Sequence, residues 1–157
     1  MNTNMTQQMA QLANNFCALV ERFEDCQLET WLQEMADLLP RLHAAAGGLG
    51  VSDSMSVYEH STDYDVRFEL FTQLYNVLGE RNGYNYEYDG IDGQRLSGTL
   101  ADDITDIYFD LKHGLHILDK DPSQAARDWQ HSYEFHWRHH LVDAERQLGQ
   151  IETQISH

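Results

Sequence analysis

The chain has 157 residues, 41% of them hydrophobic and 11% aromatic, which is enough to form one domain with its own core rather than a disordered chain. It carries 26 acidic against 10 basic residues, a formal net charge of −16 at pH 7. Such a charge repels phosphate backbones and anionic lipids, so it argues against direct nucleic-acid binding and membrane docking and favours cations or basic partners.

The first residues lack a basic segment followed by an apolar run, and no stretch reaches the roughly 18 apolar residues of a membrane helix. Cys17 and Cys26 are the only cysteines, too few for a disulfide framework or a thiolate zinc site. We therefore expect no signal peptide, no membrane segment and a cytoplasmic location.

Two amphipathic helices are predicted in the first 50 residues. In residues 5–24 and 28–42, apolar side chains recur at steps of three and four, which is typical of one helical face. Pro40 lies inside the second run and lacks a backbone donor, so a kink or an early stop is expected there. The glycine-rich residues 47–50 are expected to end this helix.

A third helix is predicted after Ser61, Thr62 and Asp63, each of which can cap its N-terminus. Its expected apolar residues are Phe68, Phe71, Leu74, Tyr75 and Leu78. Residues 81–96 follow, in which tyrosines at 84, 86 and 88 alternate with other residues as in a strand. Because no comparable partner strand is visible, we expect a tyrosine-rich loop.

A fourth helix is predicted after Thr99, with Asp102 and Asp103 in its first turn, where the helix dipole favours carboxylates. Its core ridge consists of Ile104, Ile107, Tyr108, Leu111, Leu115 and Leu118. A polar stripe lies almost opposite this ridge and consists of Asp103, Asp106, Asp110 and His113. A stripe opposite the core is by default a solvated face, so the geometry predicts that these side chains are exposed.

A fifth helix is predicted to begin at Asp121-Pro122, a cap followed by a first-turn proline, and to run close to the C-terminus. Its apolar stripe consists of Trp129, Tyr133, Trp137, Leu141, Ala144, Leu148, Ile151 and Ile155. Five amphipathic helices with short connections predict an all-α bundle, and the absence of a linker predicts one domain over residues 1–157.

The fifth helix contains a candidate site. His140 lies within its apolar stripe, and His136 and Asp143 lie at the edge of that stripe, one turn to either side. Two imidazoles and a carboxylate at this spacing are able to bind zinc or to form a proton-transfer pair. The competing interpretation is a buried His140 that hydrogen bonds to a neighbouring helix. One helix rarely completes a metal site, so we predict no metal ion and no cofactor.

Two segments resemble a known family. In Leu100–Leu115, an Asp-Asp pair precedes Asp-Ile-Tyr-x-Asp-Leu-Lys-x-Gly-Leu, and Trp129–Ala144 contains His-Trp-x-x-His-x-x-Asp-Ala. These motifs are similar to those of an uncharacterised bacterial family, the domain-of-unknown-function family 5063. Leu74–Asp89 resembles the family's Leu-Gly segment and aromatic-acidic loop, although Gly90 stands where relatives tend to have proline.

The resemblance implies an all-helical cytoplasmic protein and carries no assigned activity. It also implies that the aspartates of the fourth helix meet the fifth, through pairs such as Asp106 or Asp110 with His136 or Arg138, either as an internal polar network or as a ligand site. The resulting candidate polar site consists of Asp103, Asp106, Asp110, His136, His140 and Asp143.

Our leading functional interpretation is a non-enzymatic, soluble accessory or regulatory module that binds another protein. It rests on the acidic surface, on exposed aromatic side chains expected at residues 84–88 and on the lack of a catalytic motif. We expect a partner with a basic surface and leave open a homodimer. One alternative is a metal-dependent or acid/base hydrolase that uses His136, His140 and Asp143 together with an aspartate of the fourth helix. Another is an acidic nucleic-acid mimic, whose binding to basic proteins would be sensitive to salt.

Overall fold

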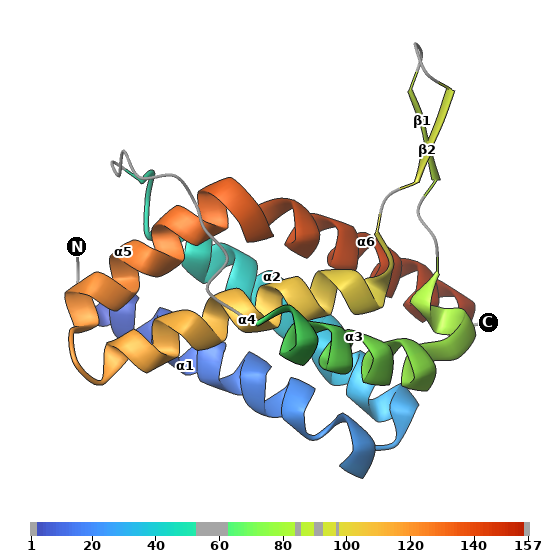
Figure 1. Ribbon diagram of the computed structural model, residues 1–157, viewed down its shortest axis with the longest axis horizontal. Coiled ribbons are helices and arrows are strands. Elements are labelled where there is room, and N and C mark those ends of the chain that lie inside the picture. The colour runs from blue at the N-terminus through green and yellow to red at the C-terminus, as the bar shows by residue number, and fades with distance from the viewer. Residues whose placement is uncertain (1–2, 53–62, 84–85, 90–92, 97, 156–157) are drawn as a thin grey trace.

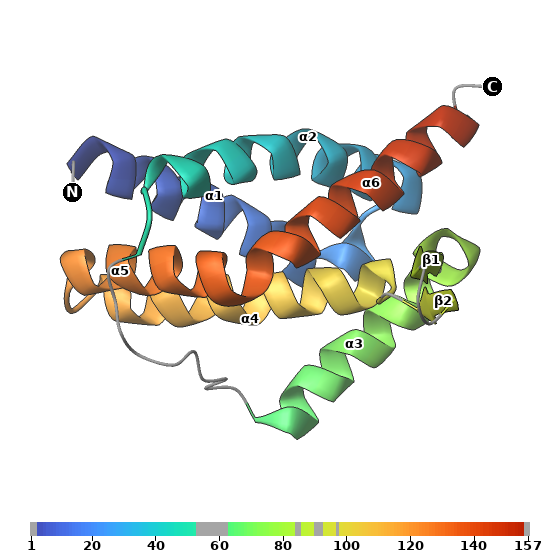
Figure 2. The same ribbon diagram turned by 90° about the horizontal axis from the view of Figure 1, so that it is seen from above.

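The computed structural model describes residues 3–52, 63–83, 86–89, 93–96 and 98–155. Helices dominate this part of the chain, which confirms the all-α prediction. The first two are α1 (Thr3–Glu21) and α2 (Leu28–Gly48), joined by a short 3₁₀ turn, η1 (Phe23–Asp25). They pack against each other as one layer of the molecule (Figure 2). No described helix combines the length and the apolar character that crossing a bilayer requires.

Pro40 lies within α2, and the early stop considered for this position does not occur. Its ring is on the exposed side of the helix, where the carbonyl group that loses its donor can face water. The helix ends at Gly48, as the glycine-rich segment predicts, and the Leu49 amide then donates to the Ala46 carbonyl at 3.2 Å.

The third helix, α3 (Tyr64–Leu78), begins with Asp63 as its N-cap, and the Asp63 Oδ1 atom accepts from the Asp65 amide at 2.7 Å. The other two predicted caps, Ser61 and Thr62, lie outside the described residues. A 3₁₀ turn, η2 (Gly79–Asn82), follows α3. In Figure 2, α3 crosses below α4 on the outside of the bundle.

Part of the predicted tyrosine-rich loop is an antiparallel hairpin, so the loop prediction is wrong for those residues. Strand β1 (Tyr86–Asp89) pairs with β2 (Gly93–Leu96), and the hairpin projects from the helices (Figure 1). The partner strand was missed because Gly93–Leu96 has no apolar alternation, whereas a ladder requires only backbone groups. Tyr84 and the remaining turn residues lie outside the described part.

The fourth helix, α4 (Leu100–Leu118), is the centre of the fold and packs against α1, α3, α5 and α6 (Figures 1 and 2). The predicted fifth helix is divided into α5 (Pro122–Ser132), a π-helical turn, η3 (Tyr133–Trp137), and α6 (Arg138–Ile155). Asp121 caps α5 ahead of Pro122, as predicted, by accepting from the Gln124 amide at 3.1 Å.

Three fully buried tryptophans fix the helices relative to one another. Trp31 of α2 donates from Nε1 to the Leu19 carbonyl at 2.7 Å, which joins α2 to α1. Trp129 of α5 donates to the Leu111 carbonyl of α4 at 3.2 Å. Each indole thus buries a large apolar surface without leaving its N–H group unpaired, which makes these contacts directional.

Candidate functional site

The first turn of α4 is organised by a capping box. The Thr99 Oγ1 atom accepts from the Asp102 amide at 3.4 Å, and the Asp102 Oδ2 atom accepts from the Thr99 amide at 3.0 Å. Two otherwise unpaired N–H groups are satisfied in this way. Asp102 therefore caps the N-terminus of α4. The three aspartates that follow it in α4, Asp103, Asp106 and Asp110, are not part of this cap.

These three aspartates contact histidines of the neighbouring helix. The ring of His140 in α6 bridges two of them, with Nδ1 at 2.9 Å from Asp103 Oδ1 and Nε2 at 3.1 Å from Asp106 Oδ2. His136, in the π-turn, hydrogen bonds through Nδ1 to Asp110 Oδ2. The two segments therefore converge, and His140 is a hydrogen-bonded histidine, as one interpretation of the sequence predicts, although it is only partly buried, with 16% of its side chain exposed.

The same pattern continues at the C-terminal end of α4. His113 Nδ1 lies 3.1 Å from both carboxylate oxygens of Asp128 in α5. We call the four contacts Asp103–His140, Asp106–His140, Asp110–His136 and Asp128–His113 the carboxylate–imidazole ladder. It runs along the polar stripe of α4 and connects that helix to α5, the π-turn and α6.

The prediction that the α4 stripe is solvated is wrong for Asp103 and Asp110, which are 1% and 6% exposed. The side chains of Asp106 and His113 are 22% and 42% exposed, so the stripe is partly open to solvent at those two positions. A helical wheel shows that the stripe lies opposite the apolar ridge, but not that α4 is surrounded by other helices. Since α4 is central, its polar side is covered as well, and the covering helix supplies imidazoles that satisfy the carboxylates.

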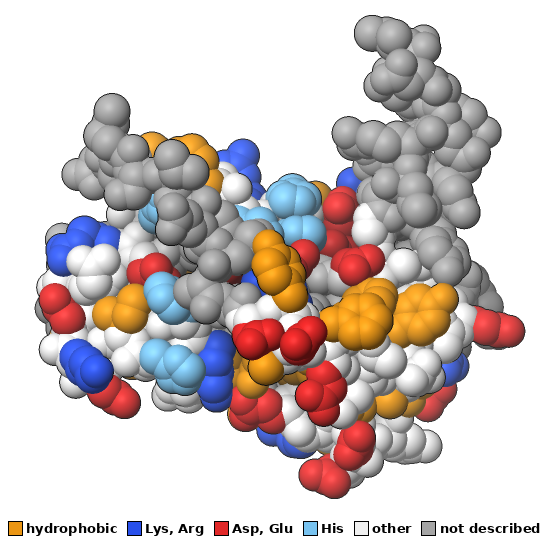
Figure 3. All heavy atoms as spheres, viewed as in Figure 1, with side chains coloured by type: hydrophobic (Ala, Val, Ile, Leu, Met, Phe, Trp, Pro, Cys, Tyr) orange, Lys and Arg blue, Asp and Glu red, His pale blue; other side chains and the backbone are white. Residues whose placement is uncertain are grey.

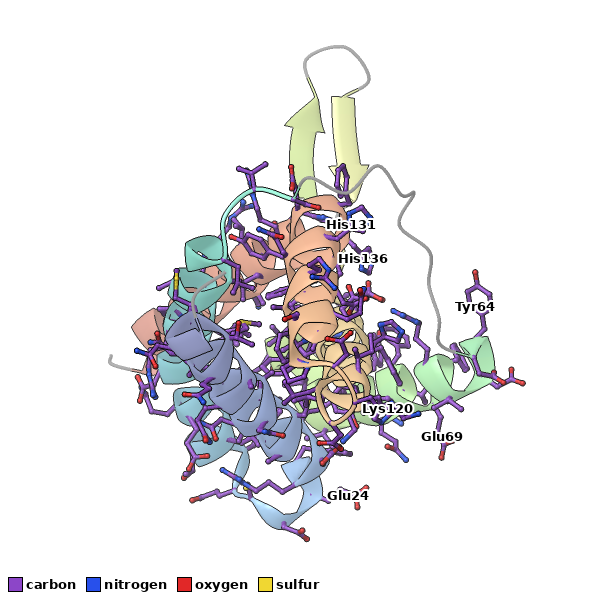
Figure 4. The ribbon with its side chains drawn as sticks, turned by 90° about the vertical axis from the view of Figure 1, so that its left-hand side faces the viewer. Glu24, Tyr64, Glu69, Lys120, His131 and His136 are labelled. Atoms are coloured by element: carbon purple, nitrogen blue, oxygen red, sulfur yellow. The ribbon has the colours of Figure 1, made fainter. Side chains whose placement is uncertain are left out.

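The π-turn places His136 in this arrangement. A π-turn has i→i+5 hydrogen bonds, so it contains an extra residue and changes which side chains of the following helix face inward. Trp137 remains fully buried and Tyr133 nearly so, with their ring centroids 4.8 Å apart, while His136 faces α4 (Figure 4). Such turns are frequent at functional sites.

Burial and pairing alter the proton affinities of Asp103 and His140. Burial raises the pKa of Asp103 to about 6, although the hydrogen bond from His140 opposes the rise. Burial alone would lower the pKa of His140, but the hydrogen bond to Asp103 and the charge of Asp106 outweigh it and raise that pKa. The second oxygen of Asp103, Oδ2, is buried without a hydrogen-bond partner in the described part of the chain.

Two residues stand at the margin of the cluster. His139 stacks on His140 with ring centroids 4.0 Å apart, and burial together with the neighbouring imidazoles lowers its pKa. Asp143, a predicted site residue, lies 3.6 Å from Arg146 and reaches Asp103 only through its charge. The structure therefore brings five of the six predicted residues into direct contact and leaves Asp143 beside them.

Sequence reasoning missed Arg67 of α3, which forms an ion pair with Asp106 Oδ1 and lies over the Phe109 ring, 5.2 Å from its centroid. No spacing within one helix could have identified it, because it comes from a different helix. Its charge was nevertheless a signal, since Arg67 is the only basic residue within α3.

Three of these side chains are placed to hold a metal ion. One ligand atom each from Asp106, His136 and His140 lies within 4.8 Å of the other two. Two imidazoles and one carboxylate are ligands that zinc and related divalent ions accept. The ladder adds carboxylates behind the imidazoles, which is how histidine ligands are commonly oriented in metalloproteins.

Comparison with known proteins identifies one similar crystal structure and one matching family. The crystal structure of protein BF1032 from Bacteroides fragilis has a TM-score of 0.74 with this fold at 21% sequence identity, over 95% of this chain and 92% of the other. No curated protein matches the sequence. The model of the family described as a domain of unknown function, DUF5063, matches residues 1–154. The chain therefore belongs to the domain-of-unknown-function family 5063.

Proposed function

We propose that this protein binds a divalent transition-metal ion between α4 and α6, with Asp106, His136 and His140 as ligands. The observation that carries the proposal is the convergence of their ligand atoms within 4.8 Å. This replaces our expectation of no metal, which assumed that one helix would have to supply the whole site. The third ligand comes from α4, and Asp106 takes the place that Asp143 held in the sequence-based hypothesis.

The hydrogen bonds around the three ligands support this proposal. Asp103 lies against Nδ1 of His140 and Asp110 against Nδ1 of His136, an arrangement in which a metal ion would be coordinated through Nε2 of each ring. In the metal-free protein, a proton between His140 Nε2 and Asp106 Oδ2 accounts for their 3.1 Å contact. A metal ion would take the place of that proton, so binding is expected to strengthen as pH rises.

Three protein ligands are the number typical of catalytic zinc sites, in which water occupies a fourth position. A hydrolase would use this ion to lower the pKa of the bound water. The metal-dependent form of the hydrolase interpretation therefore requires metal binding, and a zinc titration tests that requirement.

Isothermal titration of the chelator-treated protein with zinc chloride tests the site. We expect one ion per chain for the wild type and a loss of affinity of more than about 100-fold for His136→Ala and His140→Ala, because each removes a ligand. His116→Ala is the matched control, since His116 is an exposed histidine of the same helix as Asp106. Equal losses in His116→Ala, or no stoichiometric binding by the wild type, would contradict the proposal.

The supporting carboxylates give a graded test of the same site. Asp110→Asn keeps the shape of the side chain but accepts less strongly from His136, so we expect zinc affinity to fall by about 10- to 100-fold without loss of stoichiometry. The measurement is the same titration at fixed pH. An affinity equal to that of the wild type would show that Asp110 does not orient a ligand.

A second candidate function is the binding of another protein through α3, as an accessory or regulatory module. The observation in its favour is the exposure of large apolar side chains along that helix, namely Tyr64, Val66, Phe68, Tyr75 and Val77. The aromatic residues expected to serve this role at 84–88 lie outside the described side chains. Apolar groups gathered on one helix favour an interaction surface over isolated surface exposure.

The test compares the proteins that co-purify with the wild type and with two variants. We expect one or more partners of the wild type to be lost with Phe68→Ser and retained with Phe135→Ser, because Phe135 is also exposed, at 56%, but lies in the π-turn. Partners that persist equally in both variants would show that α3 is not the binding surface.

A further inference from the structure

We propose that the outer face of α3 binds a basic segment of a partner protein, with lysine or arginine side chains lying across its aromatic rings. This rests on the second proposed function and adds the chemistry of the partner. It does not require the metal proposal, although both sites include Asp106.

The aromatic rings form a continuous row along α3. Tyr64, Phe68, Phe71 and Tyr75 follow one another at steps of four, three and four, which places them on one face of the helix. The ring centroids of Phe68 and Phe71 are 6.2 Å apart, and those of Phe71 and Tyr75 are 5.7 Å apart. Tyr64 is 77% exposed and Phe68 67%, and Tyr64 projects away from the other helices (Figure 4).

A hollow of about 470 Å³ lies between this row and the start of α4. Tyr64, Phe68 and Phe71 line it from α3, and Asp102, Thr105 and Asp106 line it from α4. Thr105 is 2% exposed, and its Oγ1 atom has no hydrogen-bond partner among the described residues. A buried hydroxyl group without a partner is costly to the folded protein.

The charges around the hollow favour a cation. Asp65 also lines it, which brings the carboxylates to three. The one cation there, Arg67, is already paired with Asp106. Aromatic rings beside carboxylates suit an ammonium or guanidinium group on an alkyl stem, because the stem packs on the rings and the charge meets the acids. Figure 3 shows the same combination of hydrophobic and acidic side chains on the face that carries α3.

Charge also favours a basic partner over two alternative occupants of this face, a second copy of the chain and the chain's own residues 53–62. A second copy of the chain carries a net charge of −16 and would be repelled. The chain's own residues 53–62 contain Asp53 and Glu59 and no lysine or arginine, so they lack the complementary charge. The aromatic rings and carboxylates of this face therefore favour a basic partner.

The probe is a synthetic amphipathic helical peptide of leucine and lysine, titrated into the full chain and followed by amide NMR shifts. We expect shifts that concentrate on α3 and the start of α4, and an affinity that falls steeply between low and high salt. Phe68→Ser and Asp65→Asn should each weaken binding by about tenfold, which corresponds to about 1.4 kcal/mol, if each residue is a central contact of the peptide. The same peptide with glutamate for lysine should not bind.

The control variants are Phe135→Ser and Glu24→Gln, which remove an exposed ring of the π-turn and an exposed carboxylate of η1, both outside α3 and outside the lining of the hollow. If they weaken binding as much as Phe68→Ser, the peptide recognises only the overall acidity and the proposal fails. If the wild type is a dimer and Phe68→Ser is a monomer, the occupant is a second copy of the chain. If Phe68→Ser increases hydrogen exchange at residues 53–62 in the free protein, the occupant is the chain's own segment. If partners require Phe68 but bind equally well at high salt, protein binding stands and the basic partner is wrong.

Discussion

His140 has a carboxylate at each ring nitrogen, an arrangement that suits a doubly protonated ring or a metal-bound one. Its pKa is raised, so the folded state binds this proton more tightly than the unfolded chain does. The resulting stabilisation is fully present below the unfolded value of about 6.5 and is lost as pH rises through the folded value.

Asp103→Asn tests this at the level of one residue. The amide accepts less strongly from His140, so we expect the pKa of His140 to fall in an NMR titration of the chelator-treated protein. We also expect the free energy of unfolding to decline less between pH 6.5 and 8.5 in the variant than in the wild type. Asp103 itself, with a pKa of about 6, affects stability mainly below that window. An unchanged His140 titration would show that the contact does not hold the proton.

The site residues were predictable from the sequence in part. His136 and His140 could be placed on one face by spacing alone, and the family motif favoured their contact with the aspartates of α4. Arg67 could not be found, because nothing in a single sequence relates a residue of α3 to one of α4. Asp143 was included because it lies one turn from His140 in the sequence. The carboxylate that contacts His140 Nε2 instead comes from another helix, as Asp106 of α4.

At the scale of elements, the central position of α4 explains the wrong prediction for its polar stripe, and Gly114 shows how closely α4 is packed. A Cβ atom added there would lie 2.0 Å from the Nε1 atom of Trp129. Only glycine allows α5 to approach this close, and the approach also permits the Trp129 hydrogen bond to the Leu111 carbonyl.

A pair of glycine substitutions tests this packing. Gly114→Ala should lower the free energy of unfolding by about 1–3 kcal/mol, because the methyl group forces α4 and α5 apart. Gly149→Ala in α6 has nothing within 4 Å of the new methyl group, so it should raise the free energy by about 0.5–1 kcal/mol through better helix propensity. Urea denaturation with equal m-values measures both. A Gly114→Ala variant as stable as the wild type would refute the close contact.

The positions of most helices followed from apolar spacing, caps and glycines, since these signals act over one or two turns. The π-turn and the hairpin did not. The stripe from Trp129 to Leu148 is apolar on both sides of the π-turn, so its periodicity hides the inserted residue. The strand Gly93–Leu96 is recognisable only through its partner.

At the scale of the whole molecule, the candidate metal site links α4 to the π-turn and α6, which are far apart in the sequence. Zinc should therefore stabilise the folded state. At a free concentration of 100 times Kd we expect the free energy of unfolding to rise by about 2.7 kcal/mol, less any binding by the unfolded chain. Thermal unfolding with and without zinc measures this. His136→Ala should show no such increase, and magnesium, which prefers oxygen ligands, should not replace zinc. An equal rise in His136→Ala would place the stabilising ion elsewhere.

Asp106 has one further consequence. One of its oxygens faces Arg67 of α3 and the other faces His140 of α6, so a single carboxylate belongs both to the hollow beneath the aromatic row and to the proposed ligand set. Thermodynamic linkage is reciprocal: if a ligand at one of these sites changes the affinity at the other, the second ligand changes the affinity at the first by the same factor. Occupation of the outer helix and of the histidine cluster would then be coupled through two atoms of one side chain.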